Sequence, residues 1–287
     1  MFPGFVAPLL IALALAAAVT TTHRRFPPIL AARMVMVTVV VVAAAALPTL
    51  WMLVLAYTAH VRVFGMAWCT SPMTGQRVPA WIGIPSLIIA TAGTWRAAKV
   101  IRSHRRLRCD VPGPVEVADH DDPFAFTLPG RAGHVLISRG MLELLEPDER
   151  AVVLAHENAH GRHRHDRYLF VAQLAASLVP PLRPLSTRLH FTLERWADEA
   201  AVAHCGDRHF VARTLGKVAL ATAAPIGALS FTGLGTPARV AALLANPTAQ
   251  PRLAHRVGLW SAIAVAGVFS IVQVHHLVGL VSTLCPY

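Results

Sequence analysis

Residues 154–160 of this 287-residue chain read LAHENAH, and the spacing within this stretch directs the interpretation of the whole sequence. On a helix, His156 and His160 are four residues apart, so both imidazoles leave from one face. Two neutral imidazoles on one face can hold a zinc ion, and Glu157 then lies beside the open coordination position. A carboxylate there can take a proton from water that the metal has acidified.

A pattern this short also arises by chance, so its neighbours decide how much weight it carries. Residues 146–149 read EPDE, which is typical of a helix start with proline at the first position and acids in the first turn. Residues 152–155 are apolar, which favours a buried helix. The context therefore supports a helical metal-binding motif.

A catalytic zinc site needs a third protein ligand, and residues 194–200, ERWADEA, offer one. Glu194 and Asp198 are four residues apart on a predicted helix that ends near Gly206. Glu194 can bind the metal, while Asp198 can accept a hydrogen bond from the far ring nitrogen of a ligand histidine. We therefore predict one zinc ion per chain, held by His156, His160 and Glu194 in a thermolysin-like arrangement.

These two motifs resemble those of membrane-embedded gluzincins, above all the BlaR/MecR-type family, and more distantly HtpX and Ste-type proteases. The resemblance covers about 130–257 by motif, including residues 133–138 and 240–247. It implies a zinc endopeptidase with Glu157 as the base, an edge strand that binds the substrate backbone, and a cytosolic DNA-binding repressor as substrate. Related families usually carry an acid five residues after the second histidine, whereas Asp166 stands six residues after His160.

Sensor members of the BlaR group carry a penicillin-binding domain, and this chain has no Ser-x-x-Lys and no Lys-Thr-Gly sequence. We therefore expect no acylation by a β-lactam. The main alternatives to a regulatory protease are an HtpX-like quality-control protease and a non-catalytic membrane signalling scaffold. Glu157 argues against the scaffold, because a purely structural zinc site has no use for a base.

Hydropathy indicates an integral membrane protein, since 55% of the residues are hydrophobic and only 14% are charged. The apolar runs predict transmembrane helices at about 2–19, 34–57, 78–95 and 259–280. The predicted fold class is mainly α, with multi-pass transmembrane helices and an inserted α+β zincin-like protease domain. We expect a transmembrane region at 1–108, the zinc domain at 109–257, and a final helix with a short tail at 258–287.

Loop charges orient the predicted helices through the positive-inside rule. The outer loop between the second and third helices holds only Arg62 and Arg77, whereas the other two loops are rich in basic residues: Arg24, Arg25, Arg33, Arg96, Lys99, Arg102, Arg105, Arg106 and Arg108. We therefore expect a cytoplasmic protease domain with both termini outside, and the resemblance implies that the membrane is the bacterial inner membrane. The net charge of +11 is attributed to this topology and to the lipid bilayer as partner, not to nucleic-acid binding. A homodimer remains an open alternative.

Cys69 and Cys285 both fall on the outer side of this topology, whereas Cys109 and Cys205 fall inside. A Cys69–Cys285 disulfide and a pair of free thiols are equally compatible with the sequence.

The apolar segment 168–182 is too short for a simple span. A crossing there would also place Glu194 on the opposite side of the membrane from the two histidines. We therefore expect a re-entrant, interfacial or buried helix. Short strands are predicted at 114–117, 124–128 and 134–138.

The sequence leaves the roles of three further histidines undecided. His204 is a candidate oxyanion stabiliser, although a surface or packing role is favoured. His163 and His165 predict a polar, solvated helix end, with a second metal site as the alternative.

Overall fold

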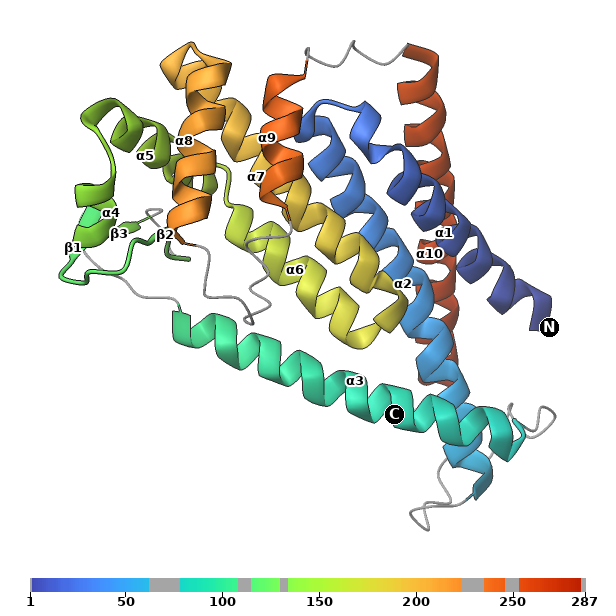
Figure 1. Ribbon diagram of the computed structural model, residues 1–287. Coiled ribbons are helices and arrows are strands. Elements are labelled where there is room, and N and C mark those ends of the chain that lie inside the picture. Colours follow the sequence, from blue (N-terminus) through green and yellow to red (C-terminus); the bar gives the residue numbers. More distant parts are fainter. Residues whose placement is uncertain are drawn as a thin grey trace.

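The computed structural model describes residues 2–61, 78–107, 115–129, 134–222, 235–245 and 253–284. The fold is mostly helical, with one small sheet (Figure 1). Its elements are α1 (Phe2–Thr22), α2 (Pro28–Val61), α3 (Ala80–Leu107), β1 (Val115–Ala118), β2 (Ala125–Thr127), β3 (Val135–Ser138), α4 (Arg139–Leu144), α5 (Pro147–Arg162), α6 (His165–Leu178), α7 (Arg183–Cys205), α8 (Arg208–Ala221), α9 (Thr236–Leu244) and α10 (Leu253–Leu284).

Long helices occupy the four positions where the sequence predicts spans. α2 packs against α1 and α10, and all three lie side by side (Figure 1). Within the described residues, only α2 is long and apolar enough to cross a membrane, over Pro28–Thr58. Shorter apolar helical stretches lie at Leu10–Thr22 and Trp260–Val272. One candidate span is therefore found, and the multi-pass arrangement stays a prediction.

The sheet has three short strands in the order β1-β3-β2, close to the predicted positions. β1 runs parallel to β3 and β2 runs antiparallel to it, which leaves β2 at one edge. Ser138 ends β3 and caps α4, because its hydroxyl accepts hydrogen bonds from the backbone N–H groups of Met141 and Phe124 at 3.0 and 2.9 Å. The central strand thus leads directly toward the helices of the site.

α5 begins as the sequence predicts. Glu146 and Glu149 form a capping box, and Pro147 stands at the first helical position. The helix contacts β2, β3, α7 and α8, so its apolar side is buried. It ends in a sharp turn in which Arg164 adopts a left-handed conformation with φ of 55°.

The segment 168–182 forms the first arm and the turn of a helical hairpin whose second arm is α7. α6 is followed by a turn of 3-10 helix at Pro180–Leu182, and α7 then runs back along α6 (Figure 1). Ala172, Ala175 and Ala176 pack in a core shared with α2 and α7. Because the chain returns, both histidines of α5 and Glu194 of α7 lie on the same side.

Candidate metal centre

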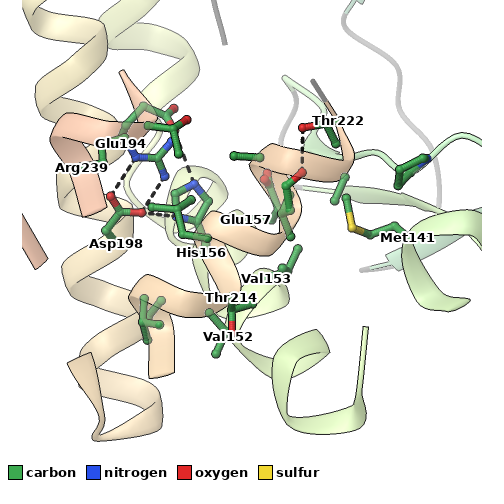
Figure 2. Close-up of a pocket in the computed structure, with 18 of the residues that line it drawn as sticks. Met141, Val152, Val153, His156, Glu157, Glu194, Asp198, Thr214, Thr222 and Arg239 are labelled. Carbon is green, nitrogen blue, oxygen red and sulfur yellow. Dashed lines mark hydrogen bonds and ion pairs between the residues drawn. The ribbon is translucent and has the colours of Figure 1, made fainter. Parts of the chain in front are cut away.

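A cavity of about 470 Å³ opens beside the crossing of α5 and α7 (Figure 2). Its polar wall contains His156, Glu157, Glu194, Asp198 and Arg239. The remaining walls are mostly apolar and come from α4, α5, α7, α8 and the segment before β2, including Phe124, Met141, Val152, Val153, Ala201, Val211, Leu215, Val218 and Ala219. A charged cluster therefore faces an apolar hollow.

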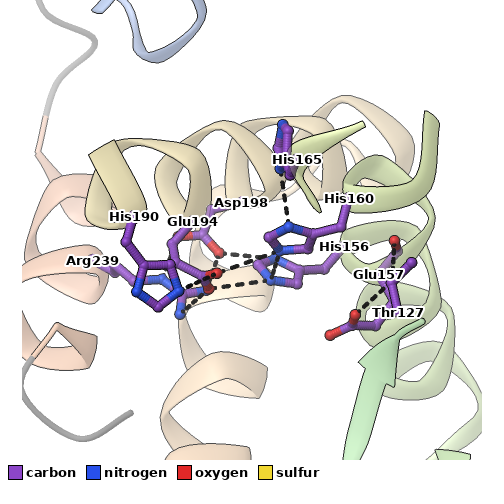
Figure 3. Close-up of polar contacts among 9 residues, drawn as sticks. All are labelled: Thr127, His156, Glu157, His160, His165, His190, Glu194, Asp198 and Arg239. Atoms are coloured by element: carbon purple, nitrogen blue, oxygen red, sulfur yellow. Dashed lines mark hydrogen bonds and ion pairs between the residues drawn. The ribbon is translucent and has the colours of Figure 1, made fainter. Parts of the chain in front are cut away.

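The three predicted ligands converge at this polar wall (Figure 3). The Nε2 atoms of His156 and His160 are 3.2 Å apart. Glu194 places Oε2 at 3.6 Å from His156 Nε2 and Oε1 at 3.5 Å from His160 Nε2. Within the described residues, this is the group of three or more ligand-type side chains that could hold a metal ion.

The spacing of these atoms fits a tetrahedral zinc ion. Zinc bonds to nitrogen and oxygen of about 2.0–2.1 Å place neighbouring ligand atoms roughly 3.3–3.4 Å apart. The two imidazole nitrogens are 3.2 Å apart, which is close to that value. Each nitrogen also lies near one oxygen of Glu194, Oε1 at 3.5 Å from His160 and Oε2 at 3.6 Å from His156, and one ligand atom from each residue falls within 4.8 Å of the others. His156, His160 and Glu194 could therefore hold the ion with little rearrangement.

Asp198 lies one turn after Glu194 on α7, as the sequence predicts. Its Oδ1 atom is 3.1 Å from Nδ1 of His156, and the residue is only 2% exposed. A carboxylate in this place fixes the ring of a ligand histidine with Nε2 directed at the metal. The structure thus brings together all four residues predicted to build the centre.

Arg239 of α9 is a part of the site that the sequence did not indicate. Its guanidinium donates to both oxygens of Asp198, from Nε at 2.9 Å and from Nη2 at 2.6 Å. Nη1 lies 2.8 Å from Oε2 of Glu194. The helix start at 236–237 could be recognised, but no local pattern points from a single arginine to acids about forty residues earlier.

The electrostatics of the cluster assign different protonation states to the two histidines. Burial opposes charge on His156, yet hydrogen bonds to Asp198 and Glu194 outweigh it and raise its pKa to about 10. Burial and the charge on His156 lower the pKa of His160 to about 3. Burial also works against ionisation of Glu194 and Asp198, but their bonds to His156 and Arg239 keep both carboxyl pKa values below the ordinary range.

Glu157 lies on the cavity side of α5, beside the end of β2. The hydroxyl of Thr127 donates to Oε2 of Glu157 at 2.8 Å and contacts its backbone carbonyl oxygen at 2.7 Å (Figure 3). Burial raises the pKa of the Glu157 carboxyl above its ordinary value. The side chain is therefore oriented by a hydroxyl and made a better proton acceptor by its surroundings.

Other predicted residues lie elsewhere. His204 is exposed and lines a separate hollow with Asn158 and Arg162, so the structure does not bring it to the metal ligands. Cys69 and Cys285 lie outside the described residues, and the described Cys205 has a free thiol.

The expectation of a solvated helix end at His163 and His165 was wrong for His165. This residue is 1% exposed, because the turn at Arg164 directs its side chain inward to Trp196. His163 stacks on Trp196 with ring centroids 4.6 Å apart.

Comparison with known proteins shows that part of the chain is similar to peptidases. Residues 95–180 match the model of Peptidase family M48. A Protease HtpX homolog of Thermoplasma acidophilum is 40% identical over 70 residues, which are 24% of this chain and 21% of that protein. A second Protease HtpX homolog, of Aeropyrum pernix, is 38% identical over 88 residues, which are 30% of this chain and 26% of that protein. No solved structure matches the chain.

These similarities have a limited extent. The aligned part spans between a fifth and about a quarter of the curated relatives, 21% and 26% of their lengths. The family match contains His156, Glu157 and His160 but ends before Glu194, so the third ligand is assigned by the geometry. The comparisons support the resemblance to HtpX, whereas the BlaR/MecR-type assignment stays a prediction.

We predict that zinc affinity rises with pH by about tenfold per unit between pH 6.5 and 8.5. Because the pKa of His156 is raised to about 10, the metal-free site carries a proton in this range, and zinc must displace it. His160 is already neutral there, so one proton is released. Chelator competition at three pH values measures the slope, and an affinity independent of pH would contradict this assignment.

Proposed function

We propose that the chain is a membrane-bound zinc endopeptidase. The observation that carries the proposal is the convergence of His156, His160 and Glu194, with Glu157 on the cavity side of the same cluster. Peptidases of family M48 are zinc-dependent, and the match over 95–180 supports the same chemistry for this chain. A scaffold with a structural zinc site would gain nothing from a half-buried carboxylate placed beside an apolar cavity.

The chain's own residues supply the proton transfers. Zinc, when bound, supplies a Lewis acid that polarises the peptide carbonyl and acidifies water. Glu157 takes a proton from the attacking water as its oxygen bonds to the carbonyl carbon, and gives the proton to the leaving nitrogen as the C–N bond breaks. The hydrogen bond from Thr127 holds the Glu157 carboxylate in place for both transfers.

The edge of the sheet provides a binding surface for an extended substrate. β2 is an edge strand in the described sheet, and Phe124 and Ala125 line the cavity. A substrate added as a further strand along β2 would carry its backbone past Glu157, which Thr127 contacts. Main-chain pairing would then provide affinity, and the cavity would select one side chain.

The apolar walls of the cavity indicate which side chain is selected. Aliphatic side chains from α5, α7 and α8 dominate the hollow beside the metal ligands. Burying a large apolar side chain there is favourable, whereas a charged one would lose its hydration without a partner. We infer a preference for large apolar residues next to the scissile bond.

We place the chain in the bacterial inner membrane as a multi-pass protein with a cytoplasmic protease domain. Large apolar side chains are exposed along α1, α2, α3 and α10, including Trp81, Ile88, Val268 and Ile271. The C-terminal half of α3 is basic, and Lys99 lies 3.6 Å from the ring centre of Trp95. Such a pairing of an aromatic and a basic residue is typical of the membrane–water interface.

Two substrate classes remain open for the protease. The similarity to proteins named Protease HtpX homolog favours a quality-control protease that cleaves damaged membrane proteins. A cytosolic DNA-binding repressor rests on the resemblance to the BlaR/MecR group alone. One defined cleavage would favour the repressor, and many cleavages in damaged proteins would favour quality control.

Replacing the base tests the proposal directly. Glu157→Gln should keep zinc and the bond from Thr127, but lower peptide cleavage about 10²- to 10⁴-fold because the proton acceptor is lost. New protein N-termini in cells expressing each form would be identified by mass spectrometry. His204→Ala, outside the cavity, is the matched control and should cleave as the wild type does. Identical profiles for wild type and Glu157→Gln under several stresses would refute the proposed protease.

Narrowing the cavity tests the inferred preference. Ala219→Phe should lower kcat/KM for peptides with a large apolar residue beside the scissile bond about 10- to 100-fold, with little loss for small residues. The neighbouring Leu220 is 82% exposed, so Leu220→Phe is the control. Profiling with a peptide library measures both, and an unchanged preference in Ala219→Phe would exclude the cavity as the selecting pocket.

A further inference from the structure

His165 is a buried histidine that contacts His160 through the ring nitrogen that does not face the metal site. It is the first residue of α6, and the left-handed turn at Arg164 brings it under the end of α5. Its Nδ1 atom lies 2.9 Å from Nδ1 of His160. The two rings are nearly perpendicular, with an interplanar angle of 88°, and Figure 3 shows the contact between them. The side chain is 1% exposed, so water does not compete for this contact.

The metal site fixes the direction of this hydrogen bond. Nε2 of His160 faces His156 and Glu194, so it must be unprotonated to bind a metal. The proton of neutral His160 is then on Nδ1, which donates, and Nδ1 of His165 accepts. His165 in turn carries its own proton on Nε2.

This second ring nitrogen, Nε2, is buried and makes no hydrogen bond within the described part of the chain. Its surroundings are aromatic, with the ring centroids of Trp196 and Tyr168 at 4.9 and 6.4 Å. A buried donor without an acceptor is destabilising. An apolar ring of similar size would remove the unpaired Nε2, although it would also leave Nδ1 of His160 without its acceptor.

We propose that His165 is a positioning residue that holds His160 in its metal-binding tautomer and orientation. It plays for His160 the part that Asp198 plays for His156, but with a neutral imidazole in place of a carboxylate. The inference rests on the proposed zinc site and adds to it a residue outside the ligand set. The unpaired Nε2 of His165 lowers the stability of the fold, whereas the contact at Nδ1 holds His160 ready to bind the metal.

Two substitutions separate positioning from packing. His165→Phe keeps an aromatic ring against Trp196 but removes the acceptor, whereas His165→Asn keeps an acceptor near the position of Nδ1 but loses ring volume. His163→Phe is the matched control, since His163 also stacks on Trp196 while the described contacts join His165, not His163, to His160.

The experiment measures zinc affinity by chelator competition and thermal unfolding of the metal-free protein, with each full chain purified in detergent. We expect zinc binding to weaken about 10- to 100-fold in His165→Phe, with a melting temperature no lower than that of the wild type. His165→Asn should bind zinc within a few-fold of the wild type despite a lower melting temperature. His163→Phe should bind zinc as the wild type does.

Three results would overturn the inference. In the first, His165→Phe binds zinc as tightly as the wild type, which leaves the proposed protease intact. In the second, His165→Asn loses as much affinity as His165→Phe, so the acceptor is not what matters. In the third, the wild type itself binds no zinc, and the proposed function is then lost together with the role of His165.

Discussion

The carboxylates of Asp198, which is buried, and Glu194, which is half-buried, lie one turn apart on α7, and the surrounding structure compensates their charge. Asp198 is 2% exposed, and removing a charge from water without a partner costs several kcal/mol. Arg239 contacts both carboxylates, and His156 contacts both from the other side. The nine-residue helix α9 is therefore tied to α7 by electrostatics, and α5 is held at the crossing by the same acids. A zinc ion bound there would replace the proton that His156 carries in the metal-free site.

The sequence predicts those parts of the site that come from spacing along one helix. His156 and His160 share a face of α5, and Glu194 and Asp198 share a face of α7, because a separation of four residues returns a side chain to the same side. Arg239 could not be predicted in this way, because its role comes from the packing of α9 on α7. The sequence predicted a solvated His165 because its neighbours are charged. In the structure, the positive φ of Arg164 turns this side chain into the interior.

The helices were predicted better than their packing. Apolar runs located α1, α2, α3 and α10, but the helices extend further; α3 continues through its basic residues to Leu107. Hydropathy could not decide the path of 168–182, because a buried hairpin and a membrane segment have the same composition. In the structure, α6 packs on α3 and α7 and the chain turns back into α7, whereas the relation of this segment to a membrane stays a prediction.

X-ray absorption at the zinc edge of the purified full chain tests the central claim most directly. The geometry predicts one zinc per chain, bound by two imidazole nitrogens and a carboxylate oxygen at about 2.0–2.2 Å, with a further light atom at the open position. A chain that retains no stoichiometric zinc would contradict the account. So would a sulfur ligand at about 2.3 Å, which would place the metal on a cysteine and away from the crossing of α5 and α7.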